Sequence, residues 1–491
     1  MKKLLITLIC IISCITSFAQ FPEFNLEATT LKKFGNIKSD QEIIIKRFIC
    51  KPTLQITGVY AEEYFLETNC GEIEINNNLD KCIFVQTDDI QDLWDYKIIT
   101  VVLPSLKMYG FLRDIREEAR ADALKFIQML EDSNLILKDP ILEDYLYQLV
   151  LKIAPRYYLD GRIENLNIII HQSNIPNAYC YPNGTIVINT GLLSVIHTED
   201  ELVALLAHEI AHFVLDHSIN NINIAITRLK RAEFWGTVAT VATAASEIAI
   251  AVDNPYYTPG FATATVAATS AAIAESMVEH LGMEYTQQQE VVADDLAIKI
   301  LELSGYDNNA LSTVFHRIKE WEIINRDYKS YHASDTHNAL YHRINNAGQP
   351  YNRINKSFEQ MVSLAVTSTA IINYNMRLYA MANALVDQNI ANNIASNEDY
   401  IIKVLCTLKM YNDAQHNAEA LDTLNIVLEN SMDLMALKYK VVILLRLGNI
   451  TEAQSTLDTY YNLVSNMRDM SEEQDWVTET QHKLTRLYTT Q

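Results

Sequence analysis

The most constraining feature of this sequence is the segment Thr198–Val214, which predicts a well-capped helix carrying two histidines. Thr198 is followed three residues later by Glu201, the spacing of a capping box at a helix N-terminus. Apolar residues then recur at three- and four-residue intervals and give the helix a wide apolar face. His208 and His212 are four residues apart, so both imidazoles project from the same side. Such a helix can present two nitrogens to a single metal ion.

A carboxylate stands next to the first of these histidines. Glu209 completes the pattern His-Glu-x-x-His. In a catalytic zinc site of this kind the imidazoles of His208 and His212 hold the ion, whereas the carboxylate takes a proton from water and passes it to the leaving amine. We therefore expect one Zn²⁺ per chain and peptide-bond hydrolysis as the reaction.

A catalytic zinc site needs a third protein ligand, and two glutamates are candidates for it. Glu290 lies in a second helical pattern, and Asp294 follows one turn later on the same face. From there Asp294 can accept the remaining N–H of a ligating histidine and fix its orientation. Glu233 is closer to the histidines along the chain, but Thr237 rather than a carboxylate follows it by one turn. The pattern favours Glu290.

These motifs resemble, in order and approximate spacing, those of the M48 peptidases, a family of zinc-dependent gluzincins. The resemblance covers residues 115 to 350 and also includes Asn177-Ala178, Thr190-Gly191-Leu192-Leu193, Glu201-Leu202 and Ser304-Gly305-Tyr306-Asp307. It implies that His208, His212 and Glu290 bind zinc and that Glu209 is the catalytic base.

The resemblance also points to two residues further along the chain. The family tends to have a His-Pro followed by an Arg-Ile, and here His337 precedes an asparagine while Arg343 precedes an isoleucine. The resemblance implies that His337 hydrogen-bonds the oxyanion or caps the zinc in a resting state, and that Arg343 orients this histidine or anchors Asp294. A second departure is Gln287, where the family commonly has an arginine.

The rest of the chain predicts a signal peptide and two further domains. We expect a signal peptide at residues 1–19, a β-rich accessory domain at 20–112, the metallopeptidase domain at 113–350 and a helical domain at 351–491. The expected fold class is α+β and mainly helical. It combines a zincin-type metallopeptidase domain with a small N-terminal β-rich domain and a C-terminal α-helical repeat-like domain.

The helical C-terminal region contains a weak repeat. Glu419-Ala420 and Leu424 recur 33 residues later as Glu452-Ala453 and Leu457, close to the tetratricopeptide period of about 34 residues. A plain helical bundle is the alternative interpretation.

A hairpin precedes the histidine helix. Pro182-Asn183-Gly184 separates the apolar run Ala178–Tyr181 from the β-branched run Thr185–Asn189. We expect the second run to form an exposed sheet edge, with which an extended peptide substrate pairs.

An Ala- and Thr-rich insert, Ala232–Met277, separates the two metal-binding helices. Its two apolar stretches, Gly236–Val252 and Gly260–Val278, are near the minimum length of a membrane span, but each contains a glutamate. We expect packed helices rather than spans, and a lid over the cleft.

Charge and cysteine content limit the partners and the fold. The formal net charge of −22 and the absence of a basic run argue against nucleic acid as a partner. The cysteines are too few and too irregularly spaced for a disulfide framework, although Cys70 and Cys82 could pair in an oxidising compartment.

These expectations combine into one function and one alternative. We expect an exported, periplasmic zinc endopeptidase that hydrolyses unfolded or misfolded envelope proteins and has no integral membrane span. The alternative is an envelope assembly helper with latent protease activity. In that case the C-terminal helices would bind an outer-membrane assembly partner.

The N-terminus yields the first testable prediction. Lys2 and Lys3 precede the apolar run Leu4–Ile15, and Ser17-Phe18-Ala19 supplies small residues for signal peptidase. Mass spectrometry of the exported protein should therefore find Gln20 as the first residue. A lipid-modified N-terminus at Cys14, in the lipobox-like Ile12-Ser13-Cys14, would contradict this and indicate membrane anchoring; export beyond the periplasm is a further alternative.

Overall fold

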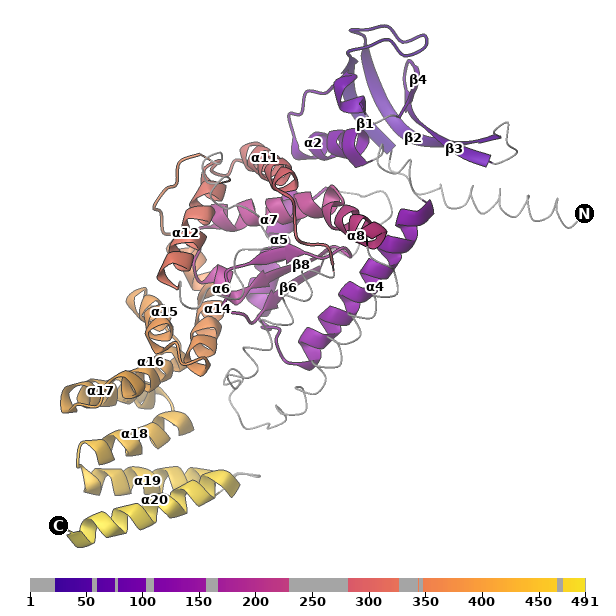
Figure 1. Cartoon of the computed structure of the whole chain (residues 1–491). Coiled ribbons are helices and arrows are strands. Elements are labelled where there is room, and N and C mark those ends of the chain that lie inside the picture. Colours follow the sequence, from indigo (N-terminus) through magenta and orange to yellow (C-terminus); the bar gives the residue numbers. More distant parts are fainter. Residues whose placement is uncertain are drawn as a thin grey trace, which may run out of the picture. The chain divides into compact units, whose positions relative to one another are not determined.

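The computed structural model describes residues 23–54, 60–75, 78–102, 110–155, 167–228, 281–325, 343, 348–465 and 471–490. The expected signal peptide, the Ala- and Thr-rich insert, Glu233 and His337 lie outside the described residues. Contacts divide the chain into two units. The described residues of the second are Gln172–Asn174 and the chain from Lys356 onward, and the first unit holds the rest (Figure 1).

The N-terminal part of the first unit is an antiparallel sheet with the strand order β4-β3-β2-β1-β5. Its strands are β1 (Glu23–Thr30), β2 (Glu42–Leu54), β3 (Tyr60–Thr68), β4 (Gly71–Glu74) and β5 (Ile83–Phe84), and a short 3₁₀ turn, η1 (Leu79–Lys81), precedes β5. Exposed and buried residues alternate along β1, so one face of the sheet is packed. Cys70 and Cys82 are both free, so the expectation that they could pair is wrong in this structure.

A short helix follows this sheet, within the region expected to be β-rich. Helix α2 (Ile90–Lys97) begins at Asp89, whose carboxylate accepts the amides of Gln91 and Asp92, and it continues into a π-helical turn, η2 (Ile98–Val102). The buried indole of Trp94 donates a 2.7 Å hydrogen bond to the carbonyl of Ile153. This bond attaches α2 to the end of α5 (Pro140–Ile153).

A second, three-stranded sheet lies ahead of the histidine helix. Its order is β6-β8-β7, with β6 (Asn167–His171), β7 (Ala178–Cys180) and β8 (Thr185–Asn189). Strand β8 pairs in parallel with β6 and antiparallel with β7. The expectation that Thr185–Asn189 is an exposed edge is therefore wrong. All five of its residues are buried, and β7 is the outer strand beside it.

The first unit also contains the histidine helix, α7 (Glu199–Val214), and further helices before and after it along the chain. These further helices are α4 (Gly110–Asp132), α5, α6 (Thr190–Leu193), α8 (His217–Arg228), α11 (Gln287–Ser304) and α12 (Ala310–Ile324). Every residue of α7 from Glu201 to Val214 is buried, although the sequence predicted only one apolar face. Helices α5, α8, α11 and α12 contact α7, as do β7 and β8 (Figure 1).

The start of α7 is fixed by hydrogen bonds that modify the expected capping box. The hydroxyl of Thr198 accepts the amide of Glu201, as expected. The Glu201 carboxylate, however, accepts the amide of His197 rather than that of Thr198, at 3.0 Å. It also accepts two hydrogen bonds from the Arg317 guanidinium of α12.

Glu199 and Asp200, in the first turn of α7, accept hydrogen bonds from α5 and from the segment after α11. Glu199 accepts hydrogen bonds from the hydroxyls of Tyr145, on α5, and Tyr306, just after α11. Asp200 accepts the amide of Asp307 at 2.9 Å. The first turn of α7 is thus bonded to the elements that pack around the rest of the helix.

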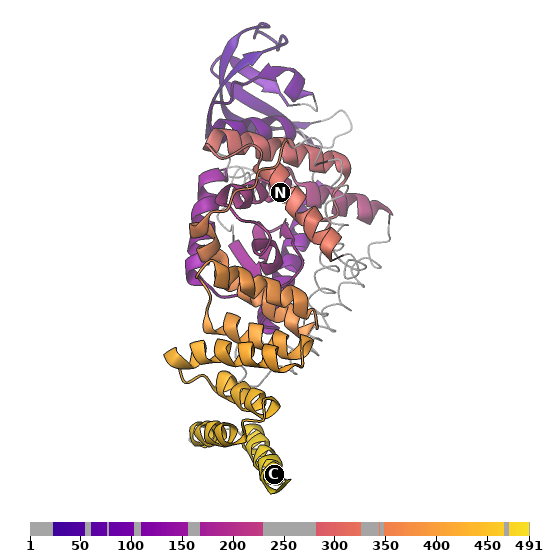
Figure 2. The same ribbon diagram turned by 90° about the vertical axis from the view of Figure 1, so that its left-hand side faces the viewer.

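The second unit is helical, as expected. Its helices are α14 (Lys356–Asn375), α15 (Tyr379–Ala391), α16 (Asn397–Met410), α17 (Ala414–Asn430), α18 (Leu434–Arg446), α19 (Ile450–Val464) and α20 (Ser471–Thr490). Each helix contacts the next along the chain (Figure 2). The repeated residues Ala420 and Leu424 in α17, and Ala453 and Leu457 in α19, are all buried. The relation to tetratricopeptide repeats stays a prediction.

The helices of the described residues were compared with the dimensions of a bilayer. None of them is by itself long and apolar enough to cross a membrane. Helix α7 and the first part of α8, His217–Ile224, meet the criterion only as a pair bent by 49°.

The Glu201–Arg317 ion pair yields a stability prediction. The Glu201 side chain is fully buried, so removing the guanidinium by Arg317→Met should lower the free energy of unfolding by about 3 kcal/mol. Urea unfolding measures this loss. The matched control is Arg353→Met, because Arg353 is mostly exposed in its pair with Asp307 and should cost under about 1 kcal/mol. Equal losses for both variants would contradict the prediction.

Candidate metal centre

Helix α7 presents the two histidines of its motif to one point. The Nε2 atoms of His208 and His212 lie 3.0 Å apart, and their ring centroids are 4.6 Å apart. Both rings are almost completely buried. The four-residue spacing places them one turn apart on one face, as the sequence predicts.

Helix α11 brings a carboxylate to the same point. The helix starts at Thr286, which forms a capping box with Gln289, and Glu290 follows at the next position. A carboxylate oxygen of Glu290 lies 3.5 Å from Nε2 of His208, and the other lies 3.8 Å from Nε2 of His212. Gln287, at the first position of α11, forms no part of this cluster.

The three side chains fit a tetrahedral metal ion. One ligand atom from each of His208, His212 and Glu290 lies within 4.8 Å of the others, and all three residues are buried. Ligands at the usual zinc distances of about 2.0–2.1 Å are about 3.3 Å from one another in a tetrahedral site. The two imidazole nitrogens are 3.0 Å apart, and each lies within 3.8 Å of one of the two oxygens of Glu290, close to that value. Two imidazoles and one carboxylate are also a donor set that zinc prefers.

Asp294 and Arg343 support this cluster from behind. Nδ1 of His208 is 3.0 Å from a carboxylate oxygen of Asp294, one turn after Glu290 on α11. Arg343 donates two hydrogen bonds to Asp294, at 2.6 and 2.8 Å, and lies 2.8 Å from Glu290. Its guanidinium also stands over the ring of Phe315, 4.2 Å from the centroid. Asp294 is therefore fixed in the orientation that lets it accept from His208.

Burial and charge act in opposite directions on these groups. Burial would lower the pKa of His208, and Arg343 adds to that effect, but the carboxylates of Asp294 and Glu290 raise it to about 9. Burial alone would likewise lower the pKa of Arg343, which the same two carboxylates raise. The carboxylates of Glu290 and Asp294 therefore surround the imidazoles with negative charge, which favours a cation at this point.

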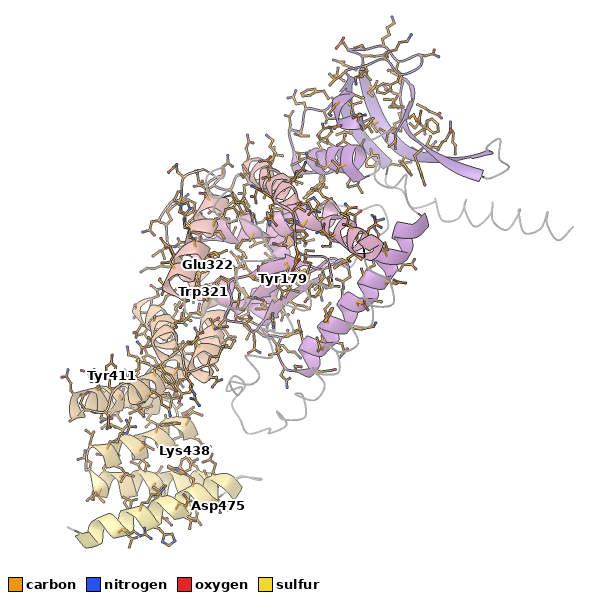
Figure 3. All side chains as sticks on the ribbon, viewed as in Figure 1. Tyr179, Trp321, Glu322, Tyr411, Lys438 and Asp475 are labelled. Carbon is orange, nitrogen blue, oxygen red and sulfur yellow. The ribbon has the colours of Figure 1, made fainter. Side chains whose placement is uncertain are left out.

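The carboxylate of Glu209 is held by the outer strand of the second sheet. The backbone amide of Cys180, on β7, donates a 3.1 Å hydrogen bond to Glu209. The amides of Ala178 and Cys180 both lie at the edge of β7 that faces away from β8, and the amide of Ala178 donates to the side-chain oxygen of Asn177. Tyr179, between these two residues, is buried and is labelled within the first unit in Figure 3. The pKa of the Cys180 thiol is raised mainly by burial and also by the negative charge of Glu209, so the thiol stays protonated.

Two residues, Tyr285 and His217, contact the ring of His212, and Ser218 contacts the first of them. The ring of Tyr285 stacks on that of His212, with centroids 3.6 Å apart, and its hydroxyl is 3.0 Å from that of Ser218. Nδ1 of His217 lies 2.9 Å from Nδ1 of His212. No local pattern in the sequence links Tyr285, which is distant along the chain, to His212.

The structure thus brings together most of the residues singled out from the sequence. His208, His212, Glu290, Asp294 and Arg343 form one cluster, with Glu209 on the same helix as the histidines. His337 lies outside the described residues. The chemical role of each residue stays a prediction.

The bond between Asp294 and His208 yields a prediction about metal affinity. Asp294→Asn replaces the anionic acceptor of the imidazole with a neutral amide, so zinc affinity should fall by about 10- to 100-fold. Competition with a chromophoric chelator measures it. The neighbouring Asp295 is exposed, and Asp295→Asn should bind zinc as the unmodified protein does. Equal affinities for all three proteins would show that Asp294 does not support the metal.

Comparison with known proteins agrees with this geometry. The family model described as peptidase family M48 matches residues 140–350. A putative beta-barrel assembly-enhancing protease of Vibrio cholerae is 27% identical over 195 residues, covering 40% of this chain and 36% of that protein. The beta-barrel assembly-enhancing protease of Escherichia coli K12 is 22% identical over 193 residues, covering 39% and 36%.

A third relative is the metalloprotease LoiP of Escherichia coli K12, which is 24% identical over 162 residues, covering 32% of this chain and 53% of that protein. The chain matches little more than a third of the length of the two assembly-enhancing proteases. Residues 140–350 contain α7 and α11, the helices that carry the cluster. Residues 140–350 therefore belong to peptidase family M48.

Proposed function

We propose that this chain is a zinc-dependent endopeptidase of the cell envelope that cleaves unfolded polypeptide. The observation that carries the proposal is the buried His208, His212 and Glu290 cluster with Glu209 on the same helix. Structural zinc sites use up all four positions on protein ligands, whereas three protein ligands leave a position for water or substrate. A buried carboxylate beside such a centre is suited to acid–base work.

The chain's own residues supply the proton transfers. When bound, zinc would lower the pKa of a water molecule and polarise the scissile carbonyl. Glu209 would accept the proton of that water and then deliver it to the leaving amine. The Cys180 amide keeps the carboxylate in one orientation, because it occupies one of the two oxygens. Asp294, fixed by Arg343, would keep His208 in the orientation that points Nε2 to the metal.

The substrate would lie along β7 rather than along β8. Antiparallel pairing of Tyr179 with Val187, and the bond from the amide of Tyr181 to Thr185, direct the main-chain groups of Ala178 and Cys180 away from β8. An extended peptide on that side would bring its main chain next to Glu209. Pairing through the main chain selects unfolded segments and is indifferent to most side chains.

Several parts of the proposal rest on sequence and relatives. The N-terminal pattern supports export, and the names of two relatives refer to beta-barrel assembly. His337 is proposed to stabilise the oxyanion or to cap the zinc at rest, and the insert Ala232–Met277 to cover the cleft. The three-domain division, with boundaries at residues 112 and 350, also stays a proposal.

A second candidate function is an assembly helper with latent protease activity. The observation that favours it is the stack of helices from Lys356 onward, an architecture suited to binding other proteins. In this case the C-terminal helices would bind an outer-membrane assembly partner.

The deciding experiment compares zinc content and casein cleavage for the unmodified protein and Glu209→Gln. Glutamine can still accept the Cys180 amide but cannot take a proton, so cleavage should fall by at least about 100-fold with zinc content unchanged. Glu302→Gln, at an exposed glutamate of α11, is the matched control and should cleave normally. Stoichiometric zinc without cleavage of any unfolded substrate would favour the helper, and absence of zinc would rule out both proposals.

A further inference from the structure

The orientation of His212 depends on a neighbour of an unusual kind. Its Nε2 points to His208 and Glu290, whereas its Nδ1 lies 2.9 Å from Nδ1 of His217. If Nε2 offers its lone pair to a metal, the proton of a neutral imidazole must be on Nδ1. The bond between the rings then has one sense only: His212 donates, and His217 accepts through Nδ1 and carries its own proton on Nε2.

The two histidines of the metal motif are therefore oriented by different acceptors. His208 faces the charged carboxylate of Asp294, which is the usual partner of a metal-binding imidazole. His212 faces a neutral imidazole. A neutral acceptor orients the ring without adding a third negative charge to a cluster that already contains Glu290 and Asp294.

The ring of His217 can lie against His212 because helix α7 ends before residue 217. In an unbroken helix residue 217 would point about 140° away from residue 212, since each residue turns the helix by about 100°. Helix α7 ends at Val214, and Asp216 adopts a left-handed backbone conformation with φ of 57°. Helix α8 then starts at His217 and brings its ring back against His212.

An ion pair with α4 holds this break. The Asp216 carboxylate pairs with the Arg116 guanidinium, and both side chains are at least nine-tenths buried. Asparagine and aspartate tolerate the left-handed conformation better than most residues, but it is still unfavourable. The ion pair ties the strained residue to α4, which also packs its Ile115 and Ala119 against Ile219 and Ile222 of α8.

His217 lines a cavity, and its ring also lies beside that of Tyr285. The cavity has a volume of about 470 Å³, with Leu215, Lys97 and Gln289 among the other lining residues. Ser218 holds Tyr285 against the face of His212. The turn at Asp216, the bond to His212 and the contact with Tyr285 together position the His217 ring.

We propose that His217 is a positioning residue that orients the metal ligand His212, and that the Arg116–Asp216 pair acts through it. This inference rests on the proposed function, because it assumes that His212 binds zinc. It assigns a role in the metal centre to α4 and to the start of α8, which carry none of its ligands.

The test measures zinc affinity by chelator competition, together with the visible absorption of the cobalt-substituted protein. His217→Leu removes the acceptor and should weaken zinc binding by about 10- to 100-fold and alter the cobalt spectrum. His217→Asn can place its side-chain oxygen where Nδ1 stands and should restore most of the affinity. The control is His171→Leu, at a buried histidine that bonds to Asn189 and not to a metal ligand.

A double-mutant comparison tests the supporting pair. Arg116→Met should weaken zinc binding less than His217→Leu does, and it should add little when combined with that variant, because both act on the same ring. Fully additive effects would mean that the pair does not act through His217.

Three results would overturn the proposal, and one of them also overturns the proposed function. Unchanged zinc affinity in His217→Leu would remove His217 from the metal centre while leaving the peptidase proposal intact. Equal losses in His217→Asn, His217→Leu and His171→Leu would mean that only folding is affected. An unmodified protein that binds no zinc would contradict both the inference and the proposed function.

Discussion

A helix buried on every side cannot leave its charged and polar side chains to the solvent, and α7 is such a helix. The cost of burying an unpaired charge is several kcal/mol, so each of these side chains must find a partner on another element. Glu201 bonds to Arg317 of α12, Glu209 to the β7 backbone, and the two histidines face Glu290 of α11. The contacts that hold the elements around α7 therefore include those of the His208, His212 and Glu290 cluster. Stability and chemistry cannot be separated in this part of the chain.

The centre is also asymmetric, with its counter-charge on one side. Asp294 and Arg343 stand behind His208, whereas neutral groups, His217 and Tyr285, stand behind His212. The arginine offsets the carboxylates, because without it Glu290 and Asp294 would repel each other in a medium of low polarity. A divalent ion added to this arrangement would meet a net negative cluster that is already oriented.

Local patterns in the sequence predicted the parts of the site that lie on helices. The spacing of His208 and His212, and of Glu290 and Asp294, follows from the helical repeat alone and could be found without a structure. The sheet was harder. Whether Thr185–Asn189 is a central or an outer strand depends on its parallel pairing with β6, an earlier strand, and nothing within the hairpin indicates that pairing. The contact of His217 with His212 depends on a helix break at Asp216 that no glycine or proline marks.

The outer strand β7 has a consequence for how the protein behaves beside other chains. Open strand edges, with amides and carbonyls both exposed, are templates for aggregation. On β7 the outward amide of Cys180 is committed to Glu209 and that of Ala178 to Asn177. The amides of a neighbouring strand can donate to the carbonyls of this edge, but its carbonyls cannot accept from those two amides. It can therefore form only half of the usual hydrogen bonds. Glu209 thus has an effect beyond the site: by accepting the Cys180 amide it makes the outer strand β7 a poor nucleus for aggregation.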